Sequence, residues 1–302
     1  QTSLTSEIRL NANTLTIGAQ SGNNTYAGIV TGSGGLVKAG GNNLLFNATL
    51  PTTFTGSVTV NGGLFYIEGS GTLGNASAIT LNKGGSFLIS NNGTTSSGTR
   101  ILDTTPITLN SADGAWNGET RPSGLVIRRD QGSTLSEQVG VLALNSGASY
   151  ARLDATVTNA ITKIAVTNVT RANNATFDIR GTALSATAAG RAGIQITDTT
   201  NQTNFIATLV GGGSTALGTK NISIVPWAIG EEVATATGIG DANMGNSLVT
   251  YVSGQTFRPL TLATEYNTFA TKASAQDNVR ESLAASLTGI AGQTINALVL
   301  DN

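Results

Sequence analysis

Apolar and polar residues alternate over short runs along this chain, and most runs are bounded by Gly or Asn. β-Branched residues dominate the runs, as in Val58-Thr59-Val60 and Ile222-Ser223-Ile224. Alternation with a period of two, closed by turn-forming residues, is typical of β-strands that bury one face. Such runs continue as far as Ala297-Leu298-Val299-Leu300. The pattern therefore predicts an all-β chain with little or no helix.

One of these runs recurs at a regular interval. Its first copy reads Val58-Thr59-Val60-Asn61-Gly62-Gly63-Leu64-Phe65, and its second reads Ile79-Thr80-Leu81-Asn82-Lys83-Gly84-Gly85-Ser86-Phe87. Asn61 and Asn82 are 21 positions apart, within the range of about 20–45 residues that repeat architectures use. Weaker echoes end at Asn110 and Asn145. The repetition favours a solenoid in which each echo is one coil.

The Asn-Gly pairs in the repeat predict the corners of these coils. A strand would end at Asn, which tolerates a left-handed corner, and the following glycines would turn the backbone into the next strand. Asn61 and Asn82 would then stack in adjacent coils and form an amide ladder. An Asn-Gly hairpin turn is the alternative, but hairpins do not require whole units of this length to recur. The predicted structural corner residues are Asn61, Gly62, Gly63, Asn82, Gly84 and Gly85.

Composition excludes several kinds of chemistry. The chain of 302 residues has 38 Gly, 46 Thr and 28 Asn, and its charged fraction of 11% is well below the usual figure of about 25%. It has no Cys and no His, so catalytic triads, cysteine nucleophiles, Cys/His zinc sites and disulfides are excluded. A net charge of −1 predicts no binding of nucleic acid. No apolar run approaches the length of a membrane span.

Three segments resemble the autotransporter-associated β-strand repeat of bacterial surface proteins. Residues 34–46 contain a Gly-Leu-x-Lys-x-Gly-like stretch followed by a short apolar strand. Residues 54–64 are similar to the central segment of that repeat, with Phe54 in place of the usual Tyr, and residues 73–77 resemble its closing Leu-Gly step. Asn42-Asn43 replaces the usual Gly-Thr. The close match covers about residues 28–90, and the remainder is more loosely similar to the spacer regions of long surface proteins.

The resemblance implies a right-handed parallel β-solenoid that is exported to the bacterial cell surface and lacks enzymatic activity. We expect residues 1–302 to form one elongated module. Regular coils would occupy residues 1–100, and less regular, spacer-like coils with loop excursions would occupy residues 101–302. No catalytic, cofactor-binding or metal-binding residue is predicted.

The two ends of the chain suggest an array. Val299-Leu300-Asp301-Asn302 continues naturally into Gln1-Thr2-Ser3-Leu4, and neither end shows a capping helix. Exposed solenoid ends invite addition of another repeat, so we expect head-to-tail self-association, either covalent or between subunits. An arbitrary truncation is the alternative. The residues expected at the assembly ends are Gln1, Leu4, Leu298 and Leu300.

Two charged motifs have both a chemical and a structural interpretation. Glu231-Glu232 could serve as a carboxylate pair for glycoside hydrolysis, but adjacent strand residues point to opposite faces, so a solvated turn is the preferred interpretation. Arg128-Arg129-Asp130 could bind an anionic polysaccharide, but a solvent-facing strand end in which one Arg is paired with Asp130 is the preferred interpretation. A polysaccharide-degrading solenoid would also need converging Asp, Lys and Arg residues, and no such cluster is evident in the sequence.

Three further segments affect the functional alternatives. Residues 274–290 show some helical spacing, but the family resemblance places a strand entry at Asp277-Asn278-Val279-Arg280, which we prefer. Residues 113–119 and 182–192 read as loops extruded from the coils, where solenoids often place binding sites. Together with Trp116 and Trp227, such loops keep open the alternative of an adhesin that binds a glycan or a host ligand.

Overall fold

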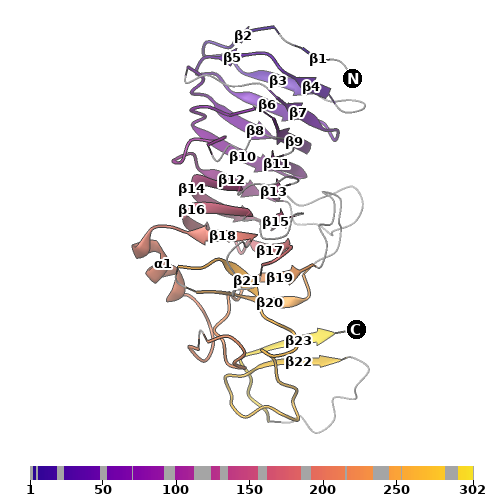
Figure 1. Ribbon diagram of the computed structural model, residues 1–302, viewed down its shortest axis with the longest axis vertical. Helices are drawn as coiled ribbons and strands as arrows, with labels where there is room; N and C mark the ends of the chain where they lie inside the picture. Colours follow the sequence, from indigo (N-terminus) through magenta and orange to yellow (C-terminus); the bar gives the residue numbers. More distant parts are fainter. Residues whose placement is uncertain are drawn as a thin grey trace.

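The computed structural model describes most of the chain, and Figure 1 shows that the described part is elongated, with the two termini toward opposite ends. The described residues are 3–4, 6–18, 24–47, 53–69, 71–91, 99–111, 124–129, 135–155, 162–184, 192–214, 216–233, 245–252, 254–282 and 292–301.

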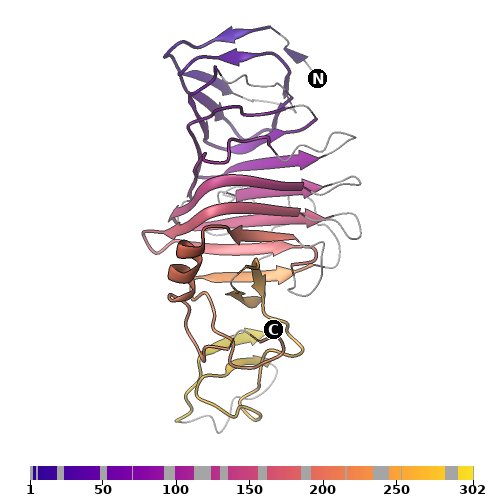
Figure 2. The same cartoon turned by 60° about the vertical axis from the view of Figure 1, so that its left-hand side comes forward.

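Two long sheets run side by side along the molecule, and successive strands alternate between them (Figures 1 and 2). In order, the first sheet contains β1 (Ser3–Leu4), β4 (Asn24–Tyr26), β7 (Leu44–Phe46), β9 (Gly63–Ile67), β11 (Gly85–Asn91), β13 (Gly124–Arg129), β15 (Ala148–Ala155), β17 (Thr176–Gly181), β19 (Ala228–Glu232), β20 (Ser247–Tyr251) and β21 (Phe257–Pro259). The second contains β3 (Leu15–Gly18), β6 (Leu36–Ala39), β8 (Ser57–Val60), β10 (Ala78–Asn82), β12 (Ile107–Asn110), β14 (Leu135–Ser146), β16 (Thr162–Arg171) and β18 (Ala192–Ile196).

Pairing is parallel from β1 to β19 in the first sheet and throughout the second. The short strands β2 (Ile8–Arg9) and β5 (Val30–Thr31) also pair in parallel and form a third side of the first coils. The chain therefore winds from one sheet to the other and back in each coil. This arrangement confirms the predicted parallel β-solenoid.

The register keeps equivalent residues stacked although the coils differ in length. Leu36 pairs with Val58 and Val58 with Ile79, so these two coils are of nearly equal length. The next steps, from Ile79 to Ile107 and from Ile107 to Leu142, are progressively longer. Some of the extra residues lie between strands and others lengthen β14, which begins well before Leu142, and the columns of side chains continue across coils of unequal length.

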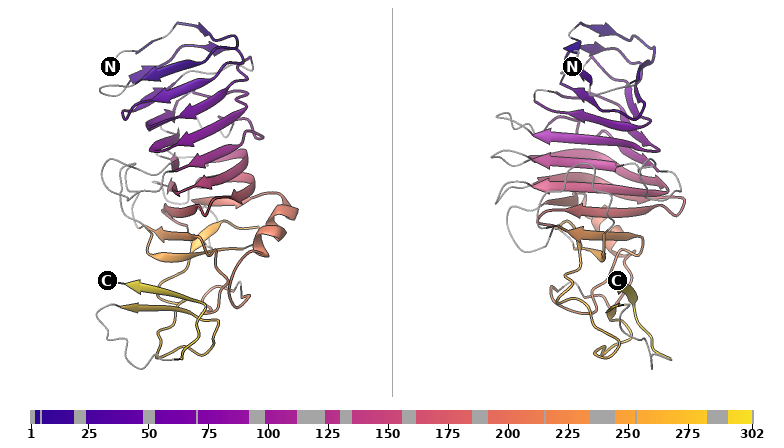
Figure 3. Two further views of the ribbon diagram at one scale, coloured as in Figure 1. Left: turned by 180° about the vertical axis from the view of Figure 1, so that it is seen from behind. Right: turned by 90° about the vertical axis from the view of Figure 1, so that its right-hand side faces the viewer.

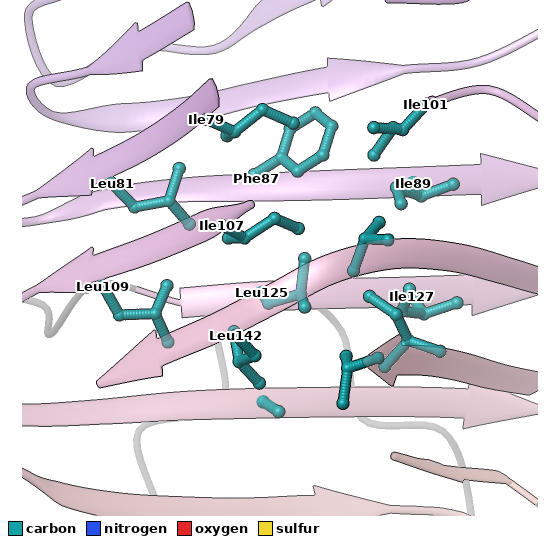
Figure 4. Packing of buried hydrophobic residues seen from close by; sticks show 14 of the residues in the cluster. Ile79, Leu81, Phe87, Ile89, Ile101, Ile107, Leu109, Leu125, Ile127 and Leu142 are labelled. Atoms are coloured by element: carbon teal, nitrogen blue, oxygen red, sulfur yellow. The ribbon is translucent and has the colours of Figure 1, made fainter. Parts of the chain in front are cut away.

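Inward-facing side chains form a continuous apolar core between the sheets. In the first sheet, the rings of Tyr26, Phe46, Phe65 and Phe87 follow one another with centroids 5.5–5.8 Å apart. Aliphatic residues from the second sheet face them, and Figure 4 shows Ile79 and Ile107 close to Phe87. Because burial of apolar area is the main favourable contribution to folding, this core between the two sheets is the main source of the stability of the fold.

The first coil is open at its outer side. Leu15 and Ile17 occupy the same inward columns as Leu36 and Lys38, yet they are only half-buried, whereas Leu36 and Lys38 are fully buried. Within the described residues, β1, β2 and β3 each pair on one edge only. Their unpaired edges present backbone N–H and C=O groups to which another strand can hydrogen-bond.

The opposite end of the regular stack is closed by the chain itself, through internal segments that precede β22 and β23. Helix α1 (Thr199–Ile206) follows β18, and its Phe205 ring meets Trp227, Tyr251 and Phe257 at centroid distances of 5.1–6.1 Å. β20 then adds antiparallel to β19, and β21 adds antiparallel to β20. Packed aromatic rings thus end the parallel stack, together with an antiparallel hairpin (Figure 2).

A second, smaller parallel pair lies beyond this cap. β22 (Asn278–Ser282) pairs with β23 (Ala297–Asp301), with Asn278 opposite Ala297. The strand entry at residues 277–280 is therefore confirmed, and residues 283–290 lie outside the described part. Figures 1 and 3 place β23 on the solenoid side of β22.

Candidate functional site

An asparagine ladder runs along one corner of the solenoid. The Nδ2 atom of Asn82 donates to Oδ1 of Asn61 at 2.7 Å, as the repeat predicts. Asn110 donates to Asn82 at 2.9 Å, and Asn145 donates to Asn110 at 2.8 Å. Nδ2 of Asn173 then donates to the backbone carbonyl of Asn145 at 3.0 Å. The weak echoes in the sequence thus correspond to successive steps of one ladder.

At the corners that follow β8 and β10, glycines and not asparagines supply the left-handed backbone, whereas at the last step of the ladder Asn173 itself has φ of +47°. φ is +154° at Gly62, +63° at Gly63 and +74° at Gly84, whereas Asn61 and Asn82 do not have positive φ. This corrects the expectation that Asn takes the left-handed position. Gly85 is required for a different reason, because a Cβ at this position would lie 2.3 Å from the carbonyl oxygen of Val60 in the preceding coil.

A buried lysine, which is not among the predicted corner residues, holds the corner one coil earlier. Lys38 is 1% exposed, and its Nζ donates to the carbonyl oxygens of Ala39, Gly40 and Gly62 at 2.6–3.0 Å. Burial lowers the pKa of Lys38. A signal for this role is present in the sequence, because Lys38 occupies an inward position in the alternation that begins at Leu36.

Replacing Asn82 with Ala should lower the free energy of unfolding by about 1–2 kcal/mol, the usual net worth of one or two hydrogen bonds. The substitution removes one donated and one accepted hydrogen bond from the ladder. Lys83→Ala is the matched control, since Lys83 is the exposed neighbour of Asn82, and its effect should be close to zero. Urea denaturation of both variants measures the difference. Equal stability of the two variants would show that the ladder adds nothing to the fold.

The residues expected at the assembly ends have different environments. Gln1 lies outside the described residues, and so does the side chain of Leu4, whose backbone belongs to β1. Leu298 and Leu300, on β23, are 41% and 49% exposed. Within the described residues β23 pairs only with β22. The two exposed leucines therefore belong to a strand that has one unpaired edge among the described residues.

A cluster of charged side chains lies on the outward face of the first sheet. The register places Arg152 of β15 beside Arg180 of β17, and Arg180 beside Glu231 of β19. Arg180 forms a salt bridge with Glu231, with Nε 3.0 Å from Oε2. Asp178 lies two residues before Arg180 on β17, so both side chains are on the same face of the sheet. The structure thus brings together Arg and acidic residues that are scattered along the sequence.

The sequence does not reveal this cluster, because long stretches of chain separate its members and only stacking brings them together. The pKa of Asp178 is raised to about 7, chiefly by burial and also by Glu231, whereas a backbone hydrogen bond and the two arginines oppose the shift. Asp178, Arg180 and Arg152 are all buried. A carboxyl that solvent does not reach has no access to a polysaccharide chain.

Glu231 and Glu232 lie within strand β19, which corrects the expectation of a solvated turn. Both line a pocket of about 270 Å³ at the junction of β19, β20 and β21. Asn246, Ser247 and residues 259–262 complete its lining. Glu231 is held by Arg180, whereas Glu232 is exposed, so one of the two carboxylates is already engaged in an ion pair.

The other segments singled out in the sequence are only partly described. Arg128 and Arg129 end strand β13, as expected, and Asp130 lies outside the described residues. Residues 113–119, including Trp116, and residues 185–191 also lie outside them. Trp227 is half-buried against the core, where the Arg171 guanidinium lies 5.8 Å above its ring. Trp227 is therefore part of the cap and not of an extruded loop.

The stacked parallel sheets and the corner ladder define this chain as a β-solenoid protein. Comparison with protein-family models, with curated proteins and with solved structures gave no match. Among the described residues, no helix has the length and apolar character needed to cross a membrane. The same residues contain no group of His, Cys, Asp or Glu side chains arranged to hold a metal ion.

Proposed function

We propose that this chain is a non-enzymatic structural module of a bacterial extracellular fibre or surface stalk, which assembles head to tail with further copies. The observation that carries the proposal is the in-register parallel stack from β3 to β18, with its continuous core and asparagine ladder. Such a stack forms a stiff spacer because each coil inside it is hydrogen-bonded to the coil before it and to the coil after it. Resemblance to the autotransporter-associated repeat supports the location on a cell surface.

Self-association is supported by the open first coil. Within the part of the chain that the structure describes, its strands have unpaired edges, and the inward side chains of Leu15 and Ile17 are only half-buried. Pairing with a strand from another copy would satisfy those edges and bury both side chains. Because α1 and β20–β21 close the far end of the stack, the tail contact would be made by the exposed face of β23, with Leu298 and Leu300, and not by its edge, which lies on the solenoid side of β22.

Electron microscopy and light scattering of the purified chain test the assembly. We expect elongated oligomers whose axial repeat matches one module. Ile17→Lys places a charge among the half-buried residues of the open coil and should dissociate them, whereas Thr16→Lys, at the exposed neighbouring position, should not. Leu298→Lys should act like Ile17→Lys. A monomer at all concentrations, or equal behaviour of the position 16 and 17 variants, would contradict head-to-tail assembly, and binding on a glycan array would favour the adhesin alternative.

A further inference from the structure

The junction of β19 and β20 is the point at which parallel stacking gives way to antiparallel pairing. β19 pairs in parallel with β17 on one side and antiparallel with β20 on the other. The backbones meet very closely just before β20 begins, since a Cβ on Gly245 would lie 2.5 Å from Cα of Gly230. How firmly the cap is held therefore depends on contacts at the start of β20.

Asp178 makes one of these contacts from two strands away. Its Oδ1 accepts a hydrogen bond from the backbone N–H of Gly245 at 3.1 Å. The residue is 4% exposed, and its Oδ2 is buried without a hydrogen-bond partner among the described residues. One buried carboxyl thus links β17, inside the regular stack, to the residue that leads into the cap.

The charged and titratable groups around Asp178 come from three strands. β15 contributes Tyr150, opposite Asp178 in the register, and Arg152, opposite Arg180. β17 contributes Arg180 itself, and β19 contributes Glu231, which Arg180 already binds. Burial and, to a smaller extent, the negative charge of Glu231 oppose ionisation of Asp178, whereas the hydrogen bond from Gly245 and the two arginines favour it, and the balance leaves its pKa at about 7.

We propose that the carboxyl of Asp178 is a pH-dependent latch that holds the start of β20 against the solenoid when it is neutral and loosens it when it ionises. A neutral carboxyl leaves Oδ2 without a hydrogen-bond partner, whereas a carboxylate keeps a negative charge in a site that solvent does not reach, and this burial outweighs the favourable contributions of Gly245 and the two arginines. Since the latched form binds the proton more tightly than an open form with a hydrated carboxyl, the latch weakens as the pH rises from the ordinary range of an Asp carboxyl toward neutrality, and it weakens no further above that. The latch does not depend on the proposed structural role.

Hydrogen exchange of the β20 amides, measured by mass spectrometry between pH 5.5 and 8.5, tests this device. After correction for intrinsic exchange rates, protection of β20 should fall with rising pH more steeply than protection of β10 in the same sample. Asp178→Asn keeps the Oδ1 acceptor without the titration, so the difference between β20 and β10 should become independent of pH. The same pH dependence in wild type and Asp178→Asn would overturn the proposal.

A second pair of variants keeps the test decisive if Asp178→Asn fails to fold. Glu231→Gln removes the neighbouring negative charge and its ion pair with Arg180, so the midpoint of the transition should move down by about one pH unit. Glu232→Gln, at the adjacent exposed position, is the control and should leave the midpoint in place. An unchanged midpoint in Glu231→Gln, or equal loss of protection in β10 and β20 of the wild-type chain, would also overturn the latch.

Discussion

Phe65→Ala should lower the free energy of unfolding by about 3–5 kcal/mol, the usual cost of removing a fully buried aromatic side chain. The Phe65 ring is completely buried and lies between those of Phe46 and Phe87, at centroid distances of 5.5 and 5.8 Å. Backbone hydrogen bonds fix the spacing between coils, so the neighbouring rings cannot close the gap. Urea denaturation followed by circular dichroism measures the loss.

Tyr66→Ala provides the control for this prediction. Tyr66 follows Phe65 on β9 but lies on the outward face and is only half-buried. Its replacement removes a ring of similar size without opening the core, so the loss of stability should be clearly smaller. If both variants lost the same stability, the stacked rings would contribute no more than any other partly buried surface.

Stability should fall as the pH rises from about 4.5 to about 7, and Glu137 should account for much of this fall. Its side chain is completely buried, and burial raises its pKa from 4.5 to about 7, although the N–H groups of Arg100 and Ile101 donate to it and oppose the shift. Between these two values the folded chain holds a proton that the unfolded chain has released. The free energy of unfolding therefore decreases by at most about 1.4 kcal/mol per pH unit, or about 3 kcal/mol in total.

Thermal melts of the wild-type chain and of Glu137→Gln at several pH values measure this contribution. Gln cannot titrate, so the slope with pH should become shallower in the variant, while the slope that Asp178 contributes remains. The variant loses one of the two accepted backbone hydrogen bonds, so its stability at pH 5 should be lower than that of the wild type. A wild-type chain that becomes more stable between pH 5 and pH 8 would contradict the direction worked out for Glu137.

The regular part of the fold could be predicted because it depends on local patterns. The alternation around Val58-Thr59-Val60 fixes which side chains face inward, and the recurrence of the Asn and Gly residues fixes the stacking of Asn61 and Asn82. Once one coil is placed, the next coil follows from the period. Asn110 and Asn145 join the same ladder because the register is kept when the coils become longer.

The rest of the fold, beyond the regular coils, depends on contacts that the sequence repeat does not reveal. Helix α1 has a Thr- and Asn-rich sequence with low helix propensity, and among its residues only Gln202 and Phe205 are buried, so tertiary packing rather than local preference makes it helical. Asp178 and Gly245 are far apart in the sequence and meet only in the folded chain. Their contact follows from the antiparallel addition of β20, which interrupts the repeat and so is not encoded by it.

The direction of the ladder hydrogen bonds has a mechanical consequence. They lie along the long axis of the molecule, because the strands run across it (Figure 1). A pulling force applied to the two ends would load these bonds along their length and peel the coils away in succession, unlike a shearing force that loads all bonds of a strand together. Each released coil of the shorter kind would add about 70 Å of extended chain, so the stack would lengthen stepwise under tension and dissipate energy at each step.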